Sequence, residues 1–250
     1  MSEFAEPYAR HYDLLYADKD YAAEAAYVSN LLKRSVPGGT RLMELGSGTG
    51  RHAALLAGMG FSIHGVEQSA GMLGVARQSA PAGCRFTAGD LRTVRLGETF
   101  DAVVVLFHVI GYQTTNDDLA AAFATARAHL KPGGVLLFDY WYGPAVLHQQ
   151  PSVRIKRVAD AALEVTRLTE PELLPNENVV VVNFHLFVRD KASGAVSEHR
   201  ERHRVRYLFL PEIEALLARQ GMRLEHSEEW LSGRELGLGT WYGTSLARAL

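Results

Sequence analysis

The stretch Leu42–Gly50, read as LMELGSGTG, combines residue types and spacing that could hold a ligand. An apolar run carries one acidic residue, Glu44, and then breaks into three glycines that alternate with small hydroxyl residues. Glycine permits positive φ angles and close approach of the backbone to a ligand, so we expect a strand to end where the glycines begin. The stretch Arg51–Gly58 has helical composition, and a helix that starts there presents unpaired N–H groups and a positive dipole end.

The spacing of the glycines separates this loop from two other nucleotide-binding motifs. The dinucleotide fingerprint needs its third glycine three positions after the second, whereas Gly50 follows Gly48 by two, and the Gly-Lys-Ser/Thr ending of a P-loop is absent. The loop resembles motif I of the class I S-adenosylmethionine-dependent methyltransferases, E/D-x-G-x-G-x-G, at Glu44, Gly46, Gly48 and Gly50. Taken alone, the motif could also be an ordinary glycine-rich turn between a strand and a helix.

Further chemistry-bearing residues lie at the ends of the next three expected strands. Glu67 follows the glycine loop by about 20 residues, and its two carboxylate oxygens could accept both ribose hydroxyls of a nucleoside. Asp90 could accept a hydrogen bond from an exocyclic adenine amine, and the apolar side chains at Leu106 and Phe107 could sandwich an aromatic ring. Each carboxylate alone could instead be a helix N-cap or a solvated loop residue.

The elements that must position these residues alternate along the chain. Two helices, Pro7–Tyr16 and Asp20–Arg34, come first. The pattern then predicts, in order, strand Arg41–Leu45, helix Arg51–Met59, strand Ser62–Val66, helix Ala70–Ser79, strands Arg85–Ala88 and Ala102–Leu106, helix Asn116–Leu130 and strand Val135–Phe138. This alternation predicts an α/β protein with a Rossmann-like, mostly parallel sheet and helices on both faces. The resemblance to class I methyltransferases implies that this sheet has seven strands.

After Asp139 the pattern changes to longer, alternating strands. They are expected at Val153–Val158, Leu163–Leu168, Val179–Val188 and Glu198–Phe209, followed by helix Pro211–Gln220 and strands Arg223–Glu229 and Thr240–Ala247. The chain is therefore divided into an N-terminal helical lid (1–40), a cofactor-binding α/β core (41–150), an inserted antiparallel sheet (151–210), and a C-terminal helix with the final strands of the core (211–250).

The order of glycine loop, acid, Gly-Asp pair and Lys-Pro-Gly-Gly turn over Arg41–Phe138 is similar to that of a class I methyltransferase. Outside that range the chain resembles bacterial nucleotide-linked amino-sugar N-methyltransferases. The residues that carry this resemblance are Tyr12-Asp13-Leu14-Leu15-Tyr16, Lys19-Asp20-Tyr21, Glu24-Ala25, Trp141-Tyr142-Gly143-Pro144 and Ser232-Gly233-Arg234.

The resemblance implies S-adenosylmethionine as the cofactor and a small-molecule acceptor, most simply a nucleotide-linked sugar. The cofactor contacts that it implies are Tyr12, Tyr21, Glu44, Gly46, Ser47, Gly48, Gly50, Glu67, Gln68, Met72, Asp90, Leu91 and Leu106. The implied acceptor contacts are Phe4, Trp141, Tyr142 and Arg234, and the candidate catalytic residues are His108 and Tyr112. Two positions depart from the sugar enzymes, since Phe4 replaces a substrate-facing tyrosine and Tyr112 replaces a histidine found in some of them. Nitrogen and oxygen both remain open as the methylated atom.

Methyl transfer is an in-line displacement that needs correct positioning and the exclusion of water. A sugar hydroxyl usually needs help in losing its proton, and His108, at a strand end, is the candidate for that help. His108 could instead only bond the backbone beside the cofactor. His199 and His203 share a face of one expected strand, but no cysteine or carboxylate pattern accompanies them, and no metal site is expected.

One expected strand carries arginine at every second position. Arg200, Arg202, Arg204 and Arg206 would place four guanidinium groups on one face, which suits a pyrophosphate group. The alternative is a solvated outer face or a face that pairs with acids on a neighbouring strand.

Composition narrows the class of protein. A net charge of −2 argues against nonspecific binding of nucleic acid, and the one cysteine, Cys84, forms no internal disulfide. No apolar run approaches the roughly 20 residues of a membrane helix, so we expect a cytoplasmic protein, as a monomer or a homodimer. The alternatives are a methyltransferase for another small metabolite, such as an amino acid or a natural product, and a non-catalytic cofactor-binding protein.

Overall fold

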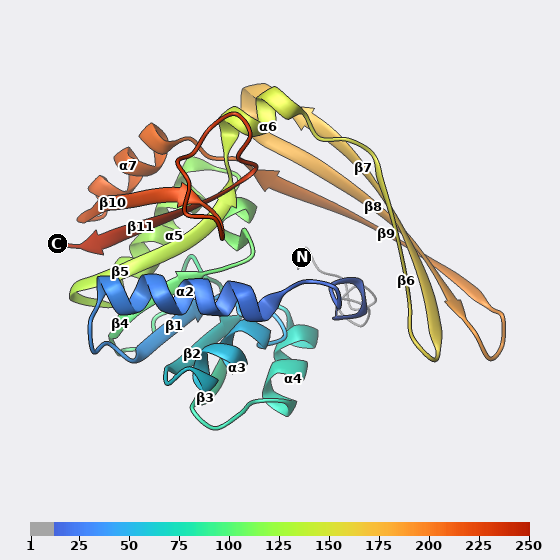
Figure 1. Cartoon of the computed structure of the whole chain (residues 1–250), viewed down its shortest axis with the longest axis horizontal. Helices are drawn as coiled ribbons and strands as arrows, with labels where there is room; N and C mark the ends of the chain where they lie inside the picture. Colours follow the sequence, from blue (N-terminus) through green and yellow to red (C-terminus); the bar gives the residue numbers. More distant parts are fainter. Residues whose placement is uncertain (1–12) are drawn as a thin grey trace.

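The computed structural model describes residues 13–250, and its centre is a seven-stranded sheet with the order β10-β11-β5-β4-β1-β2-β3 (Figure 1). The strands of this core sheet are β1 Arg41–Leu45, β2 Ser62–Glu67, β3 Cys84–Ala88, β4 Phe100–Val105, β5 Leu130–Trp141, β10 Met222–Glu229 and β11 Tyr242–Ala249. Strands β1 to β5 run parallel to one another, while β11 is antiparallel to both β5 and β10. The predicted fold class is confirmed.

Helices cover both faces of the core sheet. They are α2 Tyr21–Ser35, α3 Arg51–Gly58, α4 Ala70–Gln78, α5 Asn116–Ala128 and α7 Leu210–Arg219. Helix α6 Gly143–Gln149 instead packs through Val146 against the inserted strands, and two short 3-10 turns are η1 Val109–Tyr112 and η2 Pro175–Glu177. Side-chain caps explain several starts, because the side chains of Asp20, Ser69 and Thr115 accept from backbone N–H groups in the first turn that follows. In the described part of the chain, no helix is long and apolar enough to cross a membrane.

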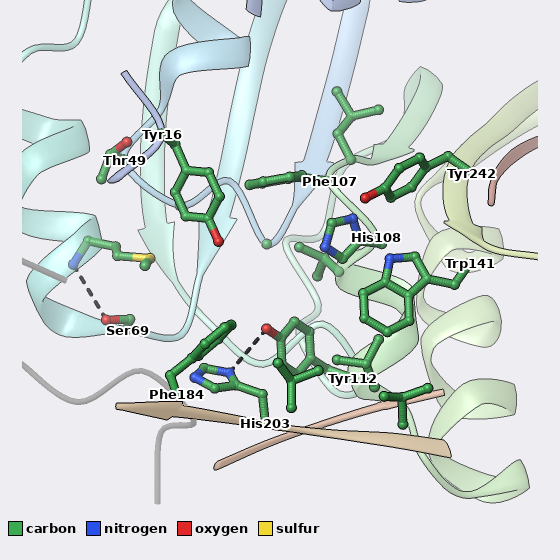
Figure 2. Close-up of a pocket in the computed structure, with 18 of the residues that line it drawn as sticks. Tyr16, Thr49, Ser69, Phe107, His108, Tyr112, Trp141, Phe184, His203 and Tyr242 are labelled. Atoms are coloured by element: carbon green, nitrogen blue, oxygen red, sulfur yellow. Dashed lines mark hydrogen bonds between the residues drawn. The ribbon is translucent and has the colours of Figure 1, made fainter. Parts of the chain in front are cut away.

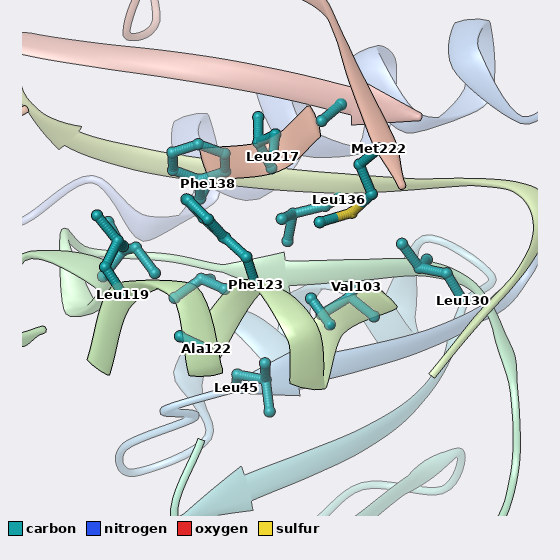
Figure 3. Close-up of a cluster of buried hydrophobic side chains, with 14 of the residues drawn as sticks. Leu45, Val103, Leu119, Ala122, Phe123, Leu130, Leu136, Phe138, Leu217 and Met222 are labelled. Atoms are coloured by element: carbon teal, nitrogen blue, oxygen red, sulfur yellow. The ribbon is translucent and has the colours of Figure 1, made fainter. Parts of the chain in front are cut away.

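The apolar runs of β4 and β5 are buried on both faces, because successive side chains of a strand point to opposite sides. Leu136 and Phe138 join the cluster under α5 and α7, where the ring centroids of Phe138 and Phe123 lie 5.4 Å apart (Figure 3). Val135 and Leu137 instead join the cluster under α2 and α3. Side chains of β5 therefore pack into hydrophobic clusters on both faces of the core sheet.

The four strands after α6 form a second, antiparallel sheet in the order β6-β7-β8-β9. Their bounds are β6 Arg154–Ala159, β7 Leu163–Leu174, β8 Val179–Asp190 and β9 Val196–Arg206. In Figure 1 these long strands project away from the core, and their ends near α6 and α7 join it. The predicted insertion is confirmed, although β7 extends six residues beyond the expected end at Leu168.

The structure also differs from the sequence expectations in three places. The predicted turn at Lys131–Gly134 is a bulge inside β5, since Leu130 pairs with Phe100 and Val135 with Ala102. Helix α6 was not expected, because it is only seven residues long. Of the first predicted helix, residues 13–15 are helical, and its earlier part lies outside the described residues.

Candidate active site

A cavity of about 1000 Å³ lies at the carboxyl ends of β1, β2 and β4, between the core and the inserted sheet. Ligand pockets typically measure about 300–1,000 Å³, so this cavity is large enough for a cofactor with part of a second molecule. Figure 2 shows Tyr16, Phe107, Trp141, Phe184 and Tyr242 pointing into it from different elements. The site therefore forms at the edge of the sheet where parallel α/β proteins bind ligands.

The glycine loop after β1 has left-handed backbone at all three glycines, with φ of +72° at Gly46, +56° at Gly48 and +81° at Gly50. A Cβ on Gly46 would lie 2.5 Å from Val109, and one on Gly50 would lie 2.8 Å from Phe86. Gly46 and Gly48 line the cavity, whereas Gly50 does not. Gly50 therefore serves the turn into α3 and the packing over Phe86.

The carboxylate of Glu67 ties the end of β2 to this loop. Its Oε2 accepts from the backbone N–H of Gly48 at 2.8 Å, and its Oε1 accepts from that of Ser69 at 2.7 Å. Burial raises the pKa of Glu67, and these two hydrogen bonds oppose the rise. Each carboxylate oxygen has two lone pairs, so Glu67 can still accept from two hydroxyls in the cavity. Gln68, beside it, also lines the cavity.

Two buried acceptors near the glycine loop have no hydrogen-bond partner among the described residues. They are Oε2 of Glu44 and Oγ of Ser47, and both residues line the cavity. Burial, followed by the charge of Glu67, raises the pKa of Glu44 to about 8. Unpartnered buried acceptors are unfavourable, so the loop fits a ligand that carries a positively charged N–H donor. The α-ammonium group of S-adenosylmethionine is such a donor.

Asp90 lines the cavity but is already paired. Arg92 forms a bidentate ion pair with it, from Nε to Oδ1 at 3.0 Å and from Nη2 to Oδ2 at 2.6 Å. This guanidinium lowers the pKa of Asp90 and also bonds Asp118. An adenine amine would share this carboxylate with Arg92. The predicted apolar contacts Met72, Leu91 and Leu106 all line the same cavity.

The corner after β4 is strained. Phe107 and His108 have φ of +62° and +48°, a conformation that costs of order 1–3 kcal/mol for each non-glycine residue. The backbone N–H of His108 donates to Oδ2 of the buried Asp139 at 2.8 Å, which holds the corner in place. Burial raises the pKa of Asp139 to about 7. Nothing in the sequence pattern marked Asp139 beyond its position at a strand end.

His108 lines the cavity with its ring 5.6 Å from that of Trp141. Burial, followed by the charge of Lys19, lowers the pKa of His108 to about 3. A base with so low a pKa is a poor proton acceptor near neutrality. Burial therefore disfavours the charged form of His108, and its expected role in proton transfer stays a prediction.

Tyr112 reaches the cavity from η1, and its hydroxyl lies 3.2 Å from Nδ1 of His203 on β9 (Figure 2). Trp141 also lines the cavity, and no described residue accepts a hydrogen bond from its buried indole N–H. Tyr21 lies on the cofactor side with the Arg51 guanidinium 4.6 Å from its ring centroid. Residues that are expected to contact the cofactor and residues that are expected to contact the acceptor therefore line the same cavity.

The comparisons with known proteins agree with this arrangement. A family model described as a methyltransferase domain matches residues 42–134. A dTDP-3-amino-3,4,6-trideoxy-alpha-D-glucopyranose N,N-dimethyltransferase from Streptomyces venezuelae is 33% identical over 230 residues, which cover 91% of this chain and 95% of the relative. The chain belongs to the S-adenosylmethionine-dependent methyltransferases.

Solved structures of other methyltransferases share the fold over nearly the whole chain. The crystal structure of DesVI from Streptomyces venezuelae has a TM-score of 0.82 at 30% identity and covers 97% of this chain and 98% of its own. That of the sugar N-methyltransferase KedS8 from Streptoalloteichus has a TM-score of 0.81 at 27% identity, with 95% and 92% covered. When S-adenosylmethionine is bound, it supplies an electrophilic methyl group on a sulfonium.

Several predicted site residues of the methyltransferase do not line the cavity. Tyr142 packs against the core cluster and bridges to Leu208, and Arg234 is exposed and pairs with Glu229. Phe4 and Tyr12 lie outside the described residues, so their expected roles stay predictions.

The sequence leaves two interpretations of the arginine face of β9 open, a pyrophosphate site and a face that pairs with acids on neighbouring elements. The residues of β9 that line the cavity are His203 and Val205, which belong to the opposite face. Arg204 forms an ion pair with Glu177, and Arg206 is buried against Glu212. The face therefore pairs with acids on neighbouring elements.

Cavity residues that the sequence did not mark as site residues include Tyr16, Arg167, Phe184, Trp241 and Tyr242. The last two reach the site because β11 lies beside β5, which places Tyr242 opposite Trp141. The aromatic pair near the start of the predicted final strand was the available signal. Within the described residues, no cluster of histidine, cysteine and carboxylate side chains could hold a metal ion.

Proposed function

We propose that this methyltransferase transfers methyl groups to the amino nitrogen of a nucleoside-diphosphate-linked amino sugar. Two of the curated relatives are N,N-dimethyltransferases whose names specify dTDP-linked 3-amino sugars, and this chain covers 95% and 92% of their lengths. Coverage of that extent includes both the core and the inserted sheet, so the acceptor side of the cavity is within the similarity.

The observation that carries the proposal is a group of cations on the cavity face of the inserted sheet. Arg154 and Lys156 lie two residues apart on β6, and Arg167 on β7 is the strand partner of Lys156. Guanidinium and ammonium groups at this spacing suit the oxygens of a diphosphate. We therefore assign the diphosphate to these three residues instead of to the arginine face of β9.

Contacts with the N-terminal segment support the same reading. Nζ of Lys156 lies 2.6 Å from Oδ1 of Asp18, and Nη1 of Arg167 donates to the Tyr16 hydroxyl at 3.1 Å. Asp18 thus presents an anion to a cation on the sheet, as a phosphate would. The rings of Trp241 and Tyr242 give the acceptor side flat apolar surfaces on which a base or sugar could pack.

The chain's contribution to the reaction is positioning. The glycine loop and Glu67 hold the cofactor on the core side, and the cations of β6 and β7 hold the acceptor on the opposite side. The aromatic corner between them excludes water and leaves room for in-line attack by an unprotonated amine.

An acceptor panel tests the proposal. We expect methylation of thymidine- and uridine-diphosphate amino sugars, and much slower methylation of the free amino sugars, which lack the diphosphate. The double variant Arg154→Gln/Lys156→Gln should raise the KM for the nucleotide-linked sugar at least tenfold and leave the affinity for S-adenosylmethionine unchanged. Arg157→Gln is the matched control, because Arg157 lies on the same strand and does not line the cavity. Equal rates with free and nucleotide-linked sugars would contradict the proposal.

A further inference from the structure

Three side chains form a hydrogen-bonded line from the cavity into the inserted sheet. The Tyr112 hydroxyl lies 3.2 Å from Nδ1 of His203, and Nε2 of His203 lies 2.8 Å from Oε2 of Glu201. The side chains of His203 and Glu201 are only 1% and 5% exposed. Glu201 and His203 are two residues apart on β9, so both belong to the face that turns toward the cavity.

The chemistry of these three groups determines which atom donates and which accepts in each of the two hydrogen bonds. An ionised carboxylate only accepts hydrogen bonds, so Nε2 of His203 carries the proton and donates to Glu201. Nδ1 of the neutral ring is then an acceptor, and the Tyr112 hydroxyl donates to it. A phenol oxygen has two lone pairs and can accept from a donor in the cavity while it donates to His203.

We propose that Tyr112 takes the proton that the acceptor amine must lose and passes its own proton to His203, whose charged form Glu201 stabilises. This inference rests on the proposed function, since an amino sugar arrives mostly as an ammonium ion near neutral pH. The N–H bond of the ammonium breaks as a new O–H bond forms on Tyr112, and the original O–H bond breaks as an N–H bond forms on His203.

The free amine then attacks the methyl group. The new N–C bond forms as the S–C bond breaks, and the sulfonium becomes a neutral thioether while the amine becomes a methylammonium ion. A second methylation requires that this ion also lose a proton. The line would therefore act in each of two rounds, after His203 has returned its proton to solvent.

Groups from three elements lie around His203. Glu201 faces it from β9 and Tyr112 from η1, and β8 contributes the Phe184 ring at 5.1 Å. Arg167 on β7 lies 4.7 Å from the centroid of the same Phe184 ring. The Glu201 carboxylate therefore contacts the His203 ring directly, whereas the Arg167 guanidinium and the His203 ring each contact the Phe184 ring. Tyr112 is the catalytic group, and His203 and Glu201 are positioning residues.

The dependence of kcat on pH tests the proposal with Tyr112→Phe and His203→Gln. We expect kcat to fall at least about 10²-fold at pH 6.5, in line with general acid–base contributions, for both variants. The deficit should narrow steadily toward pH 9.5, where solvent removes the proton from the amine. The ratio of dimethylated to monomethylated product should also fall at low pH, and the affinity for S-adenosylhomocysteine should not change.

The chain offers a matched control in a second histidine–carboxylate pair on the inserted sheet. Nε2 of His185 lies 3.0 Å from Oε2 of Glu198, and neither residue lines the cavity. His185→Gln should leave the pH profile as in the wild type. If His203→Gln does not fold, Tyr112→Phe still decides, because it keeps the ring and removes only the hydroxyl.

A deficit that is the same at every pH, or full activity of Tyr112→Phe at pH 6.5, would overturn the proposal. The profile is measured with whichever member of the acceptor panel the wild-type enzyme methylates best. A phenol or a simple amine as the best acceptor would contradict the nucleotide-sugar function and still allow the line to be tested, because each of these must also lose a proton.

Discussion

The backbone N–H of Gly48 and the carboxylate of Glu67 meet at 2.8 Å, and this hydrogen bond joins the carboxyl ends of β1 and β2. The glycine loop and the acid expected to bind ribose are thus one unit. Glu67→Ala should weaken binding of S-adenosylhomocysteine by about 1–3 kcal/mol, the usual cost of losing a charged hydrogen-bond partner. Isothermal titration calorimetry measures this effect, with one site per chain expected.

Glu98→Ala is the control for that measurement. Glu98 pairs with Arg41 and Arg85 at the amino ends of the strands, so this variant removes a carboxylate far from the cavity. Its affinity for S-adenosylhomocysteine should match the wild type. If both variants bind equally well, Glu67 does not contact the cofactor.

Gly50→Ala should destabilise the fold by roughly 2–4 kcal/mol, from left-handed backbone strain and from overpacking against Phe86. Gly60→Ala isolates the strain, because Gly60 has φ of +97° and a Cβ added there would meet no described atom within 4 Å. The loss of unfolding free energy, measured by urea denaturation, should be larger for Gly50→Ala than for Gly60→Ala by the cost of overpacking against Phe86. Addition of Phe86→Leu to Gly50→Ala should recover part of the loss, and the absence of any recovery would assign the cost to strain alone.

Asp139→Asn should change how stability depends on pH. The pKa of Asp139 is raised from 3.8 to about 7 in the folded chain, so its contribution to stability is present below the unfolded pKa and is lost as pH rises through the folded value. The asparagine variant lacks this titration and can still accept from the backbone N–H of His108. Between pH 5 and pH 8 the stability of the variant should therefore rise relative to the wild type by about 3 kcal/mol. An unchanged difference in unfolding free energy between the two pH values would rule out a buried neutral carboxyl.

The N-terminal segment should become protected when the cofactor binds. Tyr16 packs edge-on against Phe107 at 5.2 Å, and Nζ of Lys19 lies 4.5 Å from the Phe107 ring centroid, so the segment closes over the strained corner. Amide hydrogen exchange across residues 13–21 should slow on addition of S-adenosylhomocysteine, while exchange in α7 should not. Exchange that is indifferent to the cofactor would make this segment a fixed structural element.

The core could be predicted from sequence because its signals are local. The glycine loop, the acid at the end of β2 and the alternation of helices and strands each depend on a few neighbouring residues. Strand β1 occurs at the predicted bounds Arg41–Leu45 for this reason, and the insertion is where its longer alternating strands indicated.

The acceptor side could not be predicted in the same way, because it depends on which face of each inserted strand turns toward the core. A shift of one residue in the register of β9 would turn its arginine face toward the cavity in place of the face that carries His203. The contact between Tyr112 and His203 spans 91 positions of sequence and has no local signal. The place of Trp241 likewise follows from strand order, which sets β11 beside β5.

The most direct measurement of the central claim is mass spectrometry of the acceptor after incubation of the purified chain with deuteromethyl-labelled S-adenosylmethionine. The account predicts that a thymidine-diphosphate amino sugar gains one and then two labelled methyl groups on its amino nitrogen. One molecule of S-adenosylhomocysteine should accumulate for each methyl group transferred. Transfer of label to no nucleotide-linked amino sugar, with transfer to neutral phenols or unlinked amines instead, would contradict it.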